Sequence, residues 1–230
     1  MKETNVVEAK ETDHGTIIHQ LSDGSQREWA AVRAGLSLPT EEANGYFAIL
    51  GEDWTGGGTV FEGQKPKRGK IHLLAEREIQ SPFLDDTLKP LSDECSLVGC
   101  SNVYAEFEEE PERNMEAVLL ARDFISEQKM HISLLPAPFQ AKFRIGMEII
   151  RLYLNNALLD LPESSLASQQ LAILSHTDLI DKPEVKFIAV NGLRLAMGAF
   201  HKYRPWFGRP YTPPRHKGPP YYNVRRPRRF

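Results

Sequence analysis

An α/β fold, in which helices flank a mixed sheet, is the fold class that the sequence predicts. Strand-like apolar runs dominate the first half of the chain, and strands alternate with amphipathic helices in the second half. Apolar residues make up 41% of the 230 residues, which is enough to form one sizeable core. No apolar stretch reaches the length of about 18 residues that a membrane span needs, so none is predicted.

Strand-like segments fill most of the first half. "TIIHQL" (residues 16–21) predicts a short strand, and "REWAAVRAGL" (27–36) predicts a short helix. "GYFAILGE" (45–52) is a nearly continuous apolar run, as expected of a strand buried on both faces. "KIHLLAEREI" (70–79) predicts another strand, whereas the segment 81–94, with its acids and prolines, has the composition of a loop.

Strands and helices alternate in the second half. Pro111 suits the first turn of a helix, because its missing N–H leaves no hydrogen bond unmade there. The last helix is apolar on more than one face, which predicts that it is buried. The predicted elements are a strand at 102–107, a helix at 111–128, a strand at 131–137, and helices at 139–159, 164–176 and 184–200.

The last thirty residues have a different composition from the rest of the chain. Seven of them are Pro and seven are aromatic, and no apolar periodicity is present. Such a segment buries too little apolar surface to fold, so the sequence predicts a disordered tail. The chain therefore divides into an N-terminal extension (1–43), an α/β domain (44–200) and a basic tail (201–230).

Charge is distributed unevenly between the tail and the body. The net charge is −3, but the tail contains nine Lys and Arg and no acid, which leaves a balance of −12 on the other residues. Positive charges interleaved with aromatic rings are typical of segments that neutralise phosphates and stack on bases. A solubilising or partner-docking tail in polyproline II conformation is the structural alternative.

Two groups of basic side chains are the candidate nucleic-acid contacts. A basic turn in "QKPKRGK" precedes the predicted strand at 70–79 and lies near the acids discussed next. The candidates in the turn are Lys65, Lys67, Arg68 and Lys70, and those in the tail are Arg204, Arg209, Arg215, Arg225, Arg226, Arg228 and Arg229.

Acidic side chains follow two of the predicted strands directly. Asp53 ends the strand that begins at residue 45, and Glu106 ends the strand at 102–107. If these strands are parallel neighbours, the two carboxylates meet, and such oxygen ligands suit Mg²⁺ or Mn²⁺. Three glycines at 56–58 would let a phosphate backbone approach closely. The alternative is that the first stretch is a hairpin turn and the second a solvated helix N-terminus.

These segments resemble the ribonuclease H-like nucleases, and above all the nuclease domain of phage terminase large subunits. "GYFAILGEDWTGG" resembles the family's first motif, a strand that ends in an acid followed by Trp and Gly. "NVYAEFEEEPERNMEAV" resembles the second motif, and "VNGLRLAMGAF" the third, where the family carries an Asp in a pattern like D-A-L-R-Y-A. The RuvC-type junction resolvases are nearly as similar, and the sugar-kinase and actin group resembles "EDWTGGGTV" more weakly.

The resemblance implies a divalent-metal site. It places Asp53 at the first metal-ligand position, Glu106 at the second, and Asn191 at the third, where the family has an acid. An amide oxygen brings no charge and cannot serve as a base. Either another acid substitutes, with Glu184 preferred because it shares a helix face with Asn191, or the protein binds without cutting.

Two functions follow from the resemblance. The first is a Mg²⁺- or Mn²⁺-dependent endonuclease acting on DNA, with RNA as a possible second substrate, of the phage packaging or junction-processing type. The second is a catalytically degenerate nucleic-acid-binding component of a larger assembly, such as a virion or ribonucleoprotein. No Walker A pattern occurs, so any ATPase would be a separate partner. Cys95 and Cys100 lack zinc-site spacing and are expected to be reduced thiols of a cytosolic protein.

Overall fold

The computed structural model describes most of the chain N-terminal to the tail. The described residues are 6–13, 15–39, 43–53, 69–81, 83–105, 111–138, 142–174 and 186–202, with the backbone alone at 111–118 and 202. Of the predicted basic tail, His201 and Lys202 belong to the last helix, and residues 203–230 lie outside the described ranges. None of the helices in these ranges combines the length and the apolar character that crossing a membrane requires.

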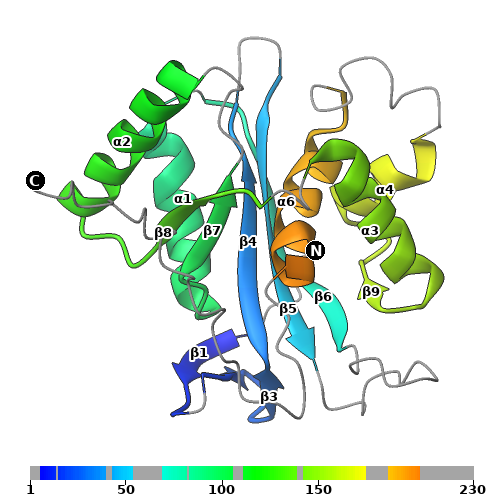
Figure 1. Cartoon of the computed structure of the whole chain (residues 1–230). Coiled ribbons are helices and arrows are strands. Elements are labelled where there is room, and N and C mark those ends of the chain that lie inside the picture. Colours follow the sequence, from blue (N-terminus) through cyan, green and yellow to red (C-terminus); the bar gives the residue numbers. More distant parts are fainter. Residues whose placement is uncertain are drawn as a thin grey trace, which may run out of the picture.

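A six-stranded mixed sheet forms the centre of the molecule (Figure 1). Its strand order is β8-β7-β4-β5-β6-β9. β5 runs antiparallel to both β4 and β6, whereas β7 is parallel to β4 and to β8, and β9 is parallel to β6. The strands span β4 Ala31–Ser37, β5 Gly45–Asp53, β6 Lys70–Ile79, β7 Asn102–Ala105, β8 Ser133–Pro136 and β9 Leu159–Asp160.

Helices cover both faces of this sheet (Figure 1). One face carries α1 (Leu84–Leu97) and α2 (Pro111–Glu127), and the other carries α3 (Phe143–Asn155), α4 (Leu166–Ile173) and α6 (Ile188–Lys202). Each face has its own apolar cluster, so the sheet separates two cores. This three-layer arrangement confirms the predicted α/β class, with helices flanking a mixed sheet.

β5 is the strand that belongs to both cores. Phe47 and Ile49 pack on the α1 side, while Tyr46, Ala48 and Leu50 pack on the α6 side. All five side chains are at most 1% exposed, which confirms the prediction that this apolar run is a strand buried on both faces.

A small antiparallel sheet lies at the end of the main sheet where β4 begins and β5 ends (Figure 1). It consists of β1 (Val6–Glu11), β2 (Ile17–Leu21) and β3 (Gln26–Trp29). The predicted strand at 16–21 is confirmed as β2. The turns that join the three strands contain Gly15 and Gly24 at positive φ, where glycine carries no steric penalty.

Two predicted elements are wrong. The segment 27–36 forms the end of β3 and most of β4 instead of a helix, because Val32, Ala34 and Leu36 alternate toward the α1 core. The segment 81–94 contains most of α1 instead of a loop. The apolar residues of α1 recur at helical spacing, and the helix accommodates Pro90 in its interior.

The predicted boundary at residue 44 also fails, because it separates β4 from its sheet neighbour. β4 pairs with β5 along its whole length, from Ala31 opposite Glu52 to Ser37 opposite Tyr46. The main sheet therefore begins within the segment that the sequence assigned to an N-terminal extension. Among the described residues, the small sheet is the one element group that precedes it.

Gly35 allows α6 to lie directly on β4. A Cβ atom at this position would meet the carbonyl oxygen of Gly192 and lie 2.5 Å from the amide nitrogen of Ala196. Both atoms belong to the helix backbone, which cannot move aside as a flexible side chain can. The contact therefore requires glycine at position 35.

We expect Gly35→Ala to lower the free energy of unfolding by about 3 kcal/mol, the upper end of the usual range for overpacked cores. Urea denaturation followed by circular dichroism measures the change. Gly24→Ala is the matched control, since a Cβ there meets nothing within 4 Å and only the positive φ is unfavourable. Equal losses for the two variants would contradict the close helix–strand contact.

Candidate functional site

The carboxyl ends of β4 and β7 lie side by side at one edge of the main sheet. The two strands are parallel, and Leu36 pairs with Ala105, so Ser37 ends β4 just beyond that pair. Parallel strands with this arrangement commonly present their functional groups at the carboxyl edge. The first half of α6 packs across the same edge and brings Asn191 to Ser37.

Ser37, Asn191 and Arg194 form a buried hydrogen-bonded chain at this edge. The Asn191 side-chain amide donates to Ser37 Oγ at 2.7 Å, and Arg194 Nε donates to Asn191 Oδ1 at 2.6 Å. The three residues are 7%, 6% and 0% exposed, and Arg194 Cζ lies 5.3 Å from the ring centroid of Phe143. These contacts fix the Asn191 amide, with its oxygen toward the guanidinium and its nitrogen toward the serine.

This polar chain does not fit a divalent-metal centre. A hydroxyl and an amide bring no negative charge, and the only carbonyl oxygen of the Asn191 side chain already accepts from a buried cation. In the described part of the chain, no group of three or more His, Cys, Asp or Glu side chains is placed to hold a metal ion. Glu106 and Glu184, the other predicted ligands, lie outside the described residues.

The N-terminus of α6 is capped by a side chain from a neighbouring helix. Gln170 Oε1, from α4, accepts from the amides of Ala189 at 2.8 Å and Val190 at 3.4 Å. Glu76 of β6 holds α4 in turn, because its carboxylate accepts from the Leu166 amide at 2.9 Å. The amides that would otherwise attract an anion are therefore satisfied within the protein.

Asp53 lies at the opposite end of the sheet from this edge. The prediction that strands 46–53 and 102–107 are adjacent and parallel is wrong, because β4 lies between them and β5 runs the other way. Asp53 lies seven positions along β5 from Tyr46, the partner of Ser37, which is a distance of about 23 Å along the strand. Ala105, which precedes Glu106, pairs with Leu36 at the Ser37 end.

Asp53 belongs instead to a cluster of ion pairs. Its Oδ2 lies 3.2 Å from Arg27 Nη2 and 4.0 Å from His72 Nε2. Asp160 Oδ2 accepts from His72 Nδ1 at 2.9 Å and lies 3.3 Å from Lys70 Nζ. Two cationic and two anionic side chains thus surround one imidazole. Lys70, a predicted phosphate contact, is engaged in this cluster.

The imidazole of His72 is neutral in this setting. Burial lowers its pKa most, and the neighbouring charge of Arg27 lowers it further, against the opposing effect of Asp160. Arg27 Nη2 donates to His72 Nε2 at 3.2 Å, so the ring proton is on Nδ1 and points to Asp160. His72 therefore acts as the acceptor that orients the Arg27 guanidinium.

Another histidine, the buried His19, joins the small sheet to the main domain. Trp29 Nε1 donates to His19 Nδ1 at 2.9 Å, and His19 Nε2 therefore carries the proton that is donated to the Val98 carbonyl at 3.0 Å. Burial lowers the pKa of His19. This neutral tautomer bridges β2, β3 and the C-terminus of α1.

The structure describes three of the fifteen site residues that the sequence singles out, namely Asp53, Lys70 and Asn191. It brings Asp53 and Lys70 into one cluster and places Asn191 with Ser37 and Arg194, which sequence reasoning missed. Ser37 could have been found from the sequence, because apolar residues alternate with a period of two over 31–37. That alternation predicts a strand that ends at Ser37. The twelve that lie outside the described residues are Glu106, Glu184, Lys65, Lys67, Arg68, Arg204, Arg209, Arg215, Arg225, Arg226, Arg228 and Arg229.

Comparison with known proteins finds similarity at the level of structure only. No protein-family model and no curated protein sequence matches the chain. The large terminase nuclease of thermophilic phage G20c, solved with magnesium, is 13% identical with a TM-score of 0.48 over 84% of this chain and 85% of that chain.

Two further solved structures have similar sequence identities and TM-scores. The g2p large terminase nuclease domain of bacteriophage SPP1, solved with manganese, is 11% identical with a TM-score of 0.46, over 76% of this chain and 87% of that chain. The fowlpox virus Holliday junction resolvase is 12% identical with a TM-score of 0.41, over 75% and 99%. At these identities the likeness concerns the fold alone. The mixed sheet between two helical layers is the α/β arrangement that the sequence predicts.

The two neutral histidines make stability depend on pH. Their folded pKa values lie below the ordinary value of about 6.5, so the unfolded chain binds more protons as the pH falls through that value. The free energy that the two neutral histidines contribute to stability is fully present at pH values above their ordinary pKa. It is lost as the pH falls toward their lowered pKa values in the folded protein. We expect the melting temperature to decrease between about pH 7.5 and pH 5.5, a window above most carboxyl pKa values.

Differential scanning fluorimetry of His19→Gln and His72→Gln tests this dependence. Each variant removes one titrating ring, so each should show a flatter decrease than the unmodified protein over the same pH range. His131→Gln, at an exposed position, is the control and should keep the original slope. A decrease that is unchanged in both buried-histidine variants would contradict the assignment.

Proposed function

We propose that the chain is a ribonuclease H-like nucleic-acid-binding protein whose metal-dependent cleavage centre is inactive. The observation that carries this proposal is the buried chain from Ser37 through Asn191 to Arg194. It occupies the edge where the parallel strands end and the last helix crosses them. A hydroxyl, an amide and a guanidinium occupy that edge; they are hydrogen-bonded to one another, and none of the three is a carboxylate.

The sheet topology changes which residue stands at the first motif position. The resemblance implies acids at the ends of two strands and on the last helix. β4 is the parallel neighbour of β7, and it ends in Ser37, whereas Asp53 ends an antiparallel strand at the far edge. With Asn191 at the third position, two of the three positions lack a carboxylate. The buried guanidinium of Arg194 further disfavours a second cation beside it.

The distribution of charge supports nucleic acid as the ligand. The body carries the excess of acids, and the segment 203–230, which follows α6, contains eight Lys and Arg and no acid. Its aromatic residues offer stacking surfaces for exposed bases. We propose that this tail supplies most of the phosphate contacts to DNA, or to RNA, within an assembly that contains other protein components.

A metal-dependent endonuclease is the second candidate. The observation that favours it is the pairing of Leu36 with Ala105, since Glu106 follows Ala105 directly in the sequence. An active centre would need Mg²⁺ or Mn²⁺ on Glu106 and Glu184, with Asn191 contributing only an amide oxygen. Its substrate would be DNA of the packaging or junction type.

A plasmid-nicking assay separates the two candidates. We expect the purified protein to bind plasmid DNA without nicking it in Mn²⁺, because two neutral residues replace ligands that would activate water. Gel electrophoresis measures nicking, and a mobility shift measures binding in the same samples. Nicking that stops with a chelator and is abolished by Glu106→Gln would contradict an inactive centre and favour the endonuclease.

Deletion of residues 203–230 tests the role of the tail. If half of its eight basic residues contact phosphates, the slope of log affinity against log salt should fall by roughly 3.6, at about 0.9 per contact with duplex DNA. Fluorescence anisotropy at several salt concentrations measures the slope. The melting temperature should stay unchanged, because a segment without apolar periodicity buries little surface. Equal slopes before and after deletion would show that the tail serves another purpose.

A further inference from the structure

Cys95 and Cys100 are the two cysteines of the chain, and the structure has both as free thiols. They are 0% and 4% exposed and belong to the apolar cluster on the α1 side of the sheet. Neither residue takes part in the function proposed above. Whether the two thiols can react with each other depends on how the chain places them.

The C-terminus of α1 brings the two cysteines together. Gly99 follows the helix with a φ of 66°, in the left-handed region. The Cys100 amide donates to the Cys95 carbonyl at 2.8 Å, and the Gly99 amide donates to the Ser96 carbonyl at 3.4 Å. These two hydrogen bonds define a Schellman motif, in which the side chains at the positions of Cys95 and Cys100 commonly contact each other.

The backbone hydrogen bond keeps the two Cα atoms within reach of a disulfide. In standard geometry a Cα lies about 2.4 Å from its own carbonyl oxygen and about 1.5 Å from its own nitrogen. With 2.8 Å between the Cys95 oxygen and the Cys100 nitrogen, the two Cα atoms are at most about 6.7 Å apart. Disulfides join Cα atoms that are about 4.4–6.8 Å apart, so a bridge here requires no large movement of the backbone.

The two side chains also point toward each other. The Cys95 thiol donates to Cys100 Sγ, and this hydrogen bond, together with burial, raises the pKa of the Cys95 thiol. The Cys100 thiol donates in turn to the Asn102 carbonyl at 3.5 Å. The two sulfur atoms are therefore neighbours, as the formation of a bond between them requires.

We propose that Cys95 and Cys100 form a reversible disulfide in the folded protein when a small disulfide such as oxidised glutathione is present. The Cys100 thiolate attacks one sulfur of the small disulfide and releases one thiol. The Cys95 sulfur then attacks Cys100 Sγ in the mixed disulfide and releases the second thiol. The two cysteines lose two electrons and two protons, which the two released thiols gain.

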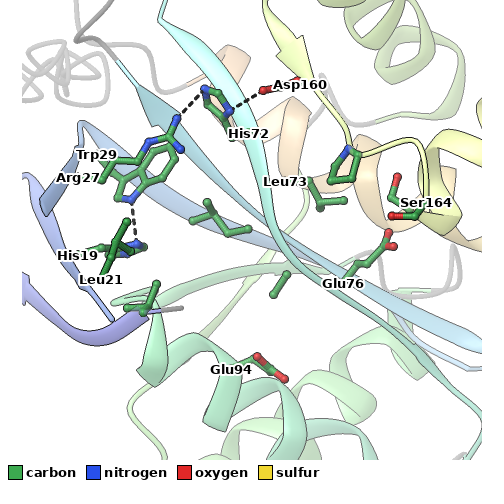
Figure 2. A pocket seen from close by; sticks show the side chains of 15 residues that line it. His19, Leu21, Arg27, Trp29, His72, Leu73, Glu76, Glu94, Asp160 and Ser164 are labelled. Atoms are coloured by element: carbon green, nitrogen blue, oxygen red, sulfur yellow. Dashed lines mark hydrogen bonds and ion pairs between the residues drawn. The ribbon is translucent and has the colours of Figure 1, made fainter. Parts of the chain in front are cut away.

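The bridge would lie directly under the contact between α1 and the small sheet. Trp29 donates to His19 (dashed line in Figure 2), and His19 donates to the Val98 carbonyl. Gly99 packs so closely on Ile17 that an added Cβ would lie 2.9 Å from Ile17 Cγ2. Because the sulfurs are buried, the oxidant reaches them only when this contact opens locally, which makes the exchange slow. The equilibrium is therefore the quantity to measure.

Equilibration of the full chain with glutathione tests the proposal. Mixtures of reduced and oxidised glutathione are quenched with acid, and the protein is unfolded, alkylated and weighed by intact mass spectrometry. With two cysteines in the chain, the disulfide is a monomer that takes up no alkylating reagent. The ratio of disulfide to dithiol should be about tenfold or more higher in the folded protein than in urea, where the loop must close without the motif. Equal ratios, disulfide-linked dimers, or mixed disulfides as the main product would overturn the proposal.

Thermodynamic linkage predicts the accompanying change in stability. A disulfide that is tenfold more favourable in the folded than in the unfolded protein stabilises the fold by the same factor, which is about 1.4 kcal/mol. The melting temperature of the oxidised protein should therefore exceed that of the reduced protein by about 3–6 °C. Differential scanning fluorimetry of the two forms measures the difference. An unchanged or lower melting temperature of the oxidised form would overturn the proposal.

Gly99→Ala connects the disulfide with the Schellman motif. Its side chain is strained at the positive φ and collides with Ile17, so it displaces the turn that positions Cys100. The ratio of disulfide to dithiol in the folded variant should fall by about threefold or more. Gly24→Ala, also at a positive φ but with nothing within 4 Å of the added Cβ, is the control and should keep the original ratio. An unchanged ratio in folded Gly99→Ala would overturn the role of the motif, and if this variant does not fold, the comparison with urea decides.

Discussion

The direct contact between the backbones of α6 and β4 is the constraint on which the rest of the structure depends. Gly35 puts no side chain between β4 and α6, so the strand backbone approaches the Gly192 carbonyl and the Ala196 amide closely, while the missing side chain of Gly192 leaves room for Tyr46 of β5. Each end of the helix is then held by a side chain. Gln170 caps the N-terminal amides, and Arg33 Nη1 donates to the Ala199 carbonyl near the C-terminus at 2.6 Å. The position of α6 along β4 is therefore closely defined.

That position decides which polar groups meet inside the protein. Asn191 lies on the strand side of α6 and reaches Ser37, and Arg194, one turn later, reaches Asn191. A fully buried guanidinium is stable only when neighbouring groups accept its protons, and the Asn191 oxygen is one of them. The Asn191 amide therefore has a structural role, because it satisfies the buried Arg194 and Ser37 side chains. Replacing Asn191 would remove these hydrogen bonds in addition to any effect on a ligand.

Composition and periodicity were sufficient to predict the α/β class, the doubly buried β5 and the helices of the second half. They failed at 27–36, where a helix was predicted, because its three alanines and two arginines suit a helix as well as a strand. Tertiary packing on α1 and α6 resolved that ambiguity. Composition also gave the wrong prediction for α1. Pro90 and the acidic residues are typical of a loop, although the apolar residues of the segment recur at helical spacing. Both failures concern segments whose local preference is weak.

The misplacement of Asp53 has a different cause, since an acid after a buried strand looks the same whether that strand is parallel or antiparallel. The connection between β4 and β5, residues 38–44, is too short for the crossover of a dozen or more residues that parallel neighbours need. Once 31–37 is taken as a strand, the short connection implies that β4 and β5 form an antiparallel hairpin. Ser37 and Asp53 then lie at opposite ends of the sheet. The polar chain at one end and the ion-pair cluster at the other are therefore physically separate sites, and neither completes the other.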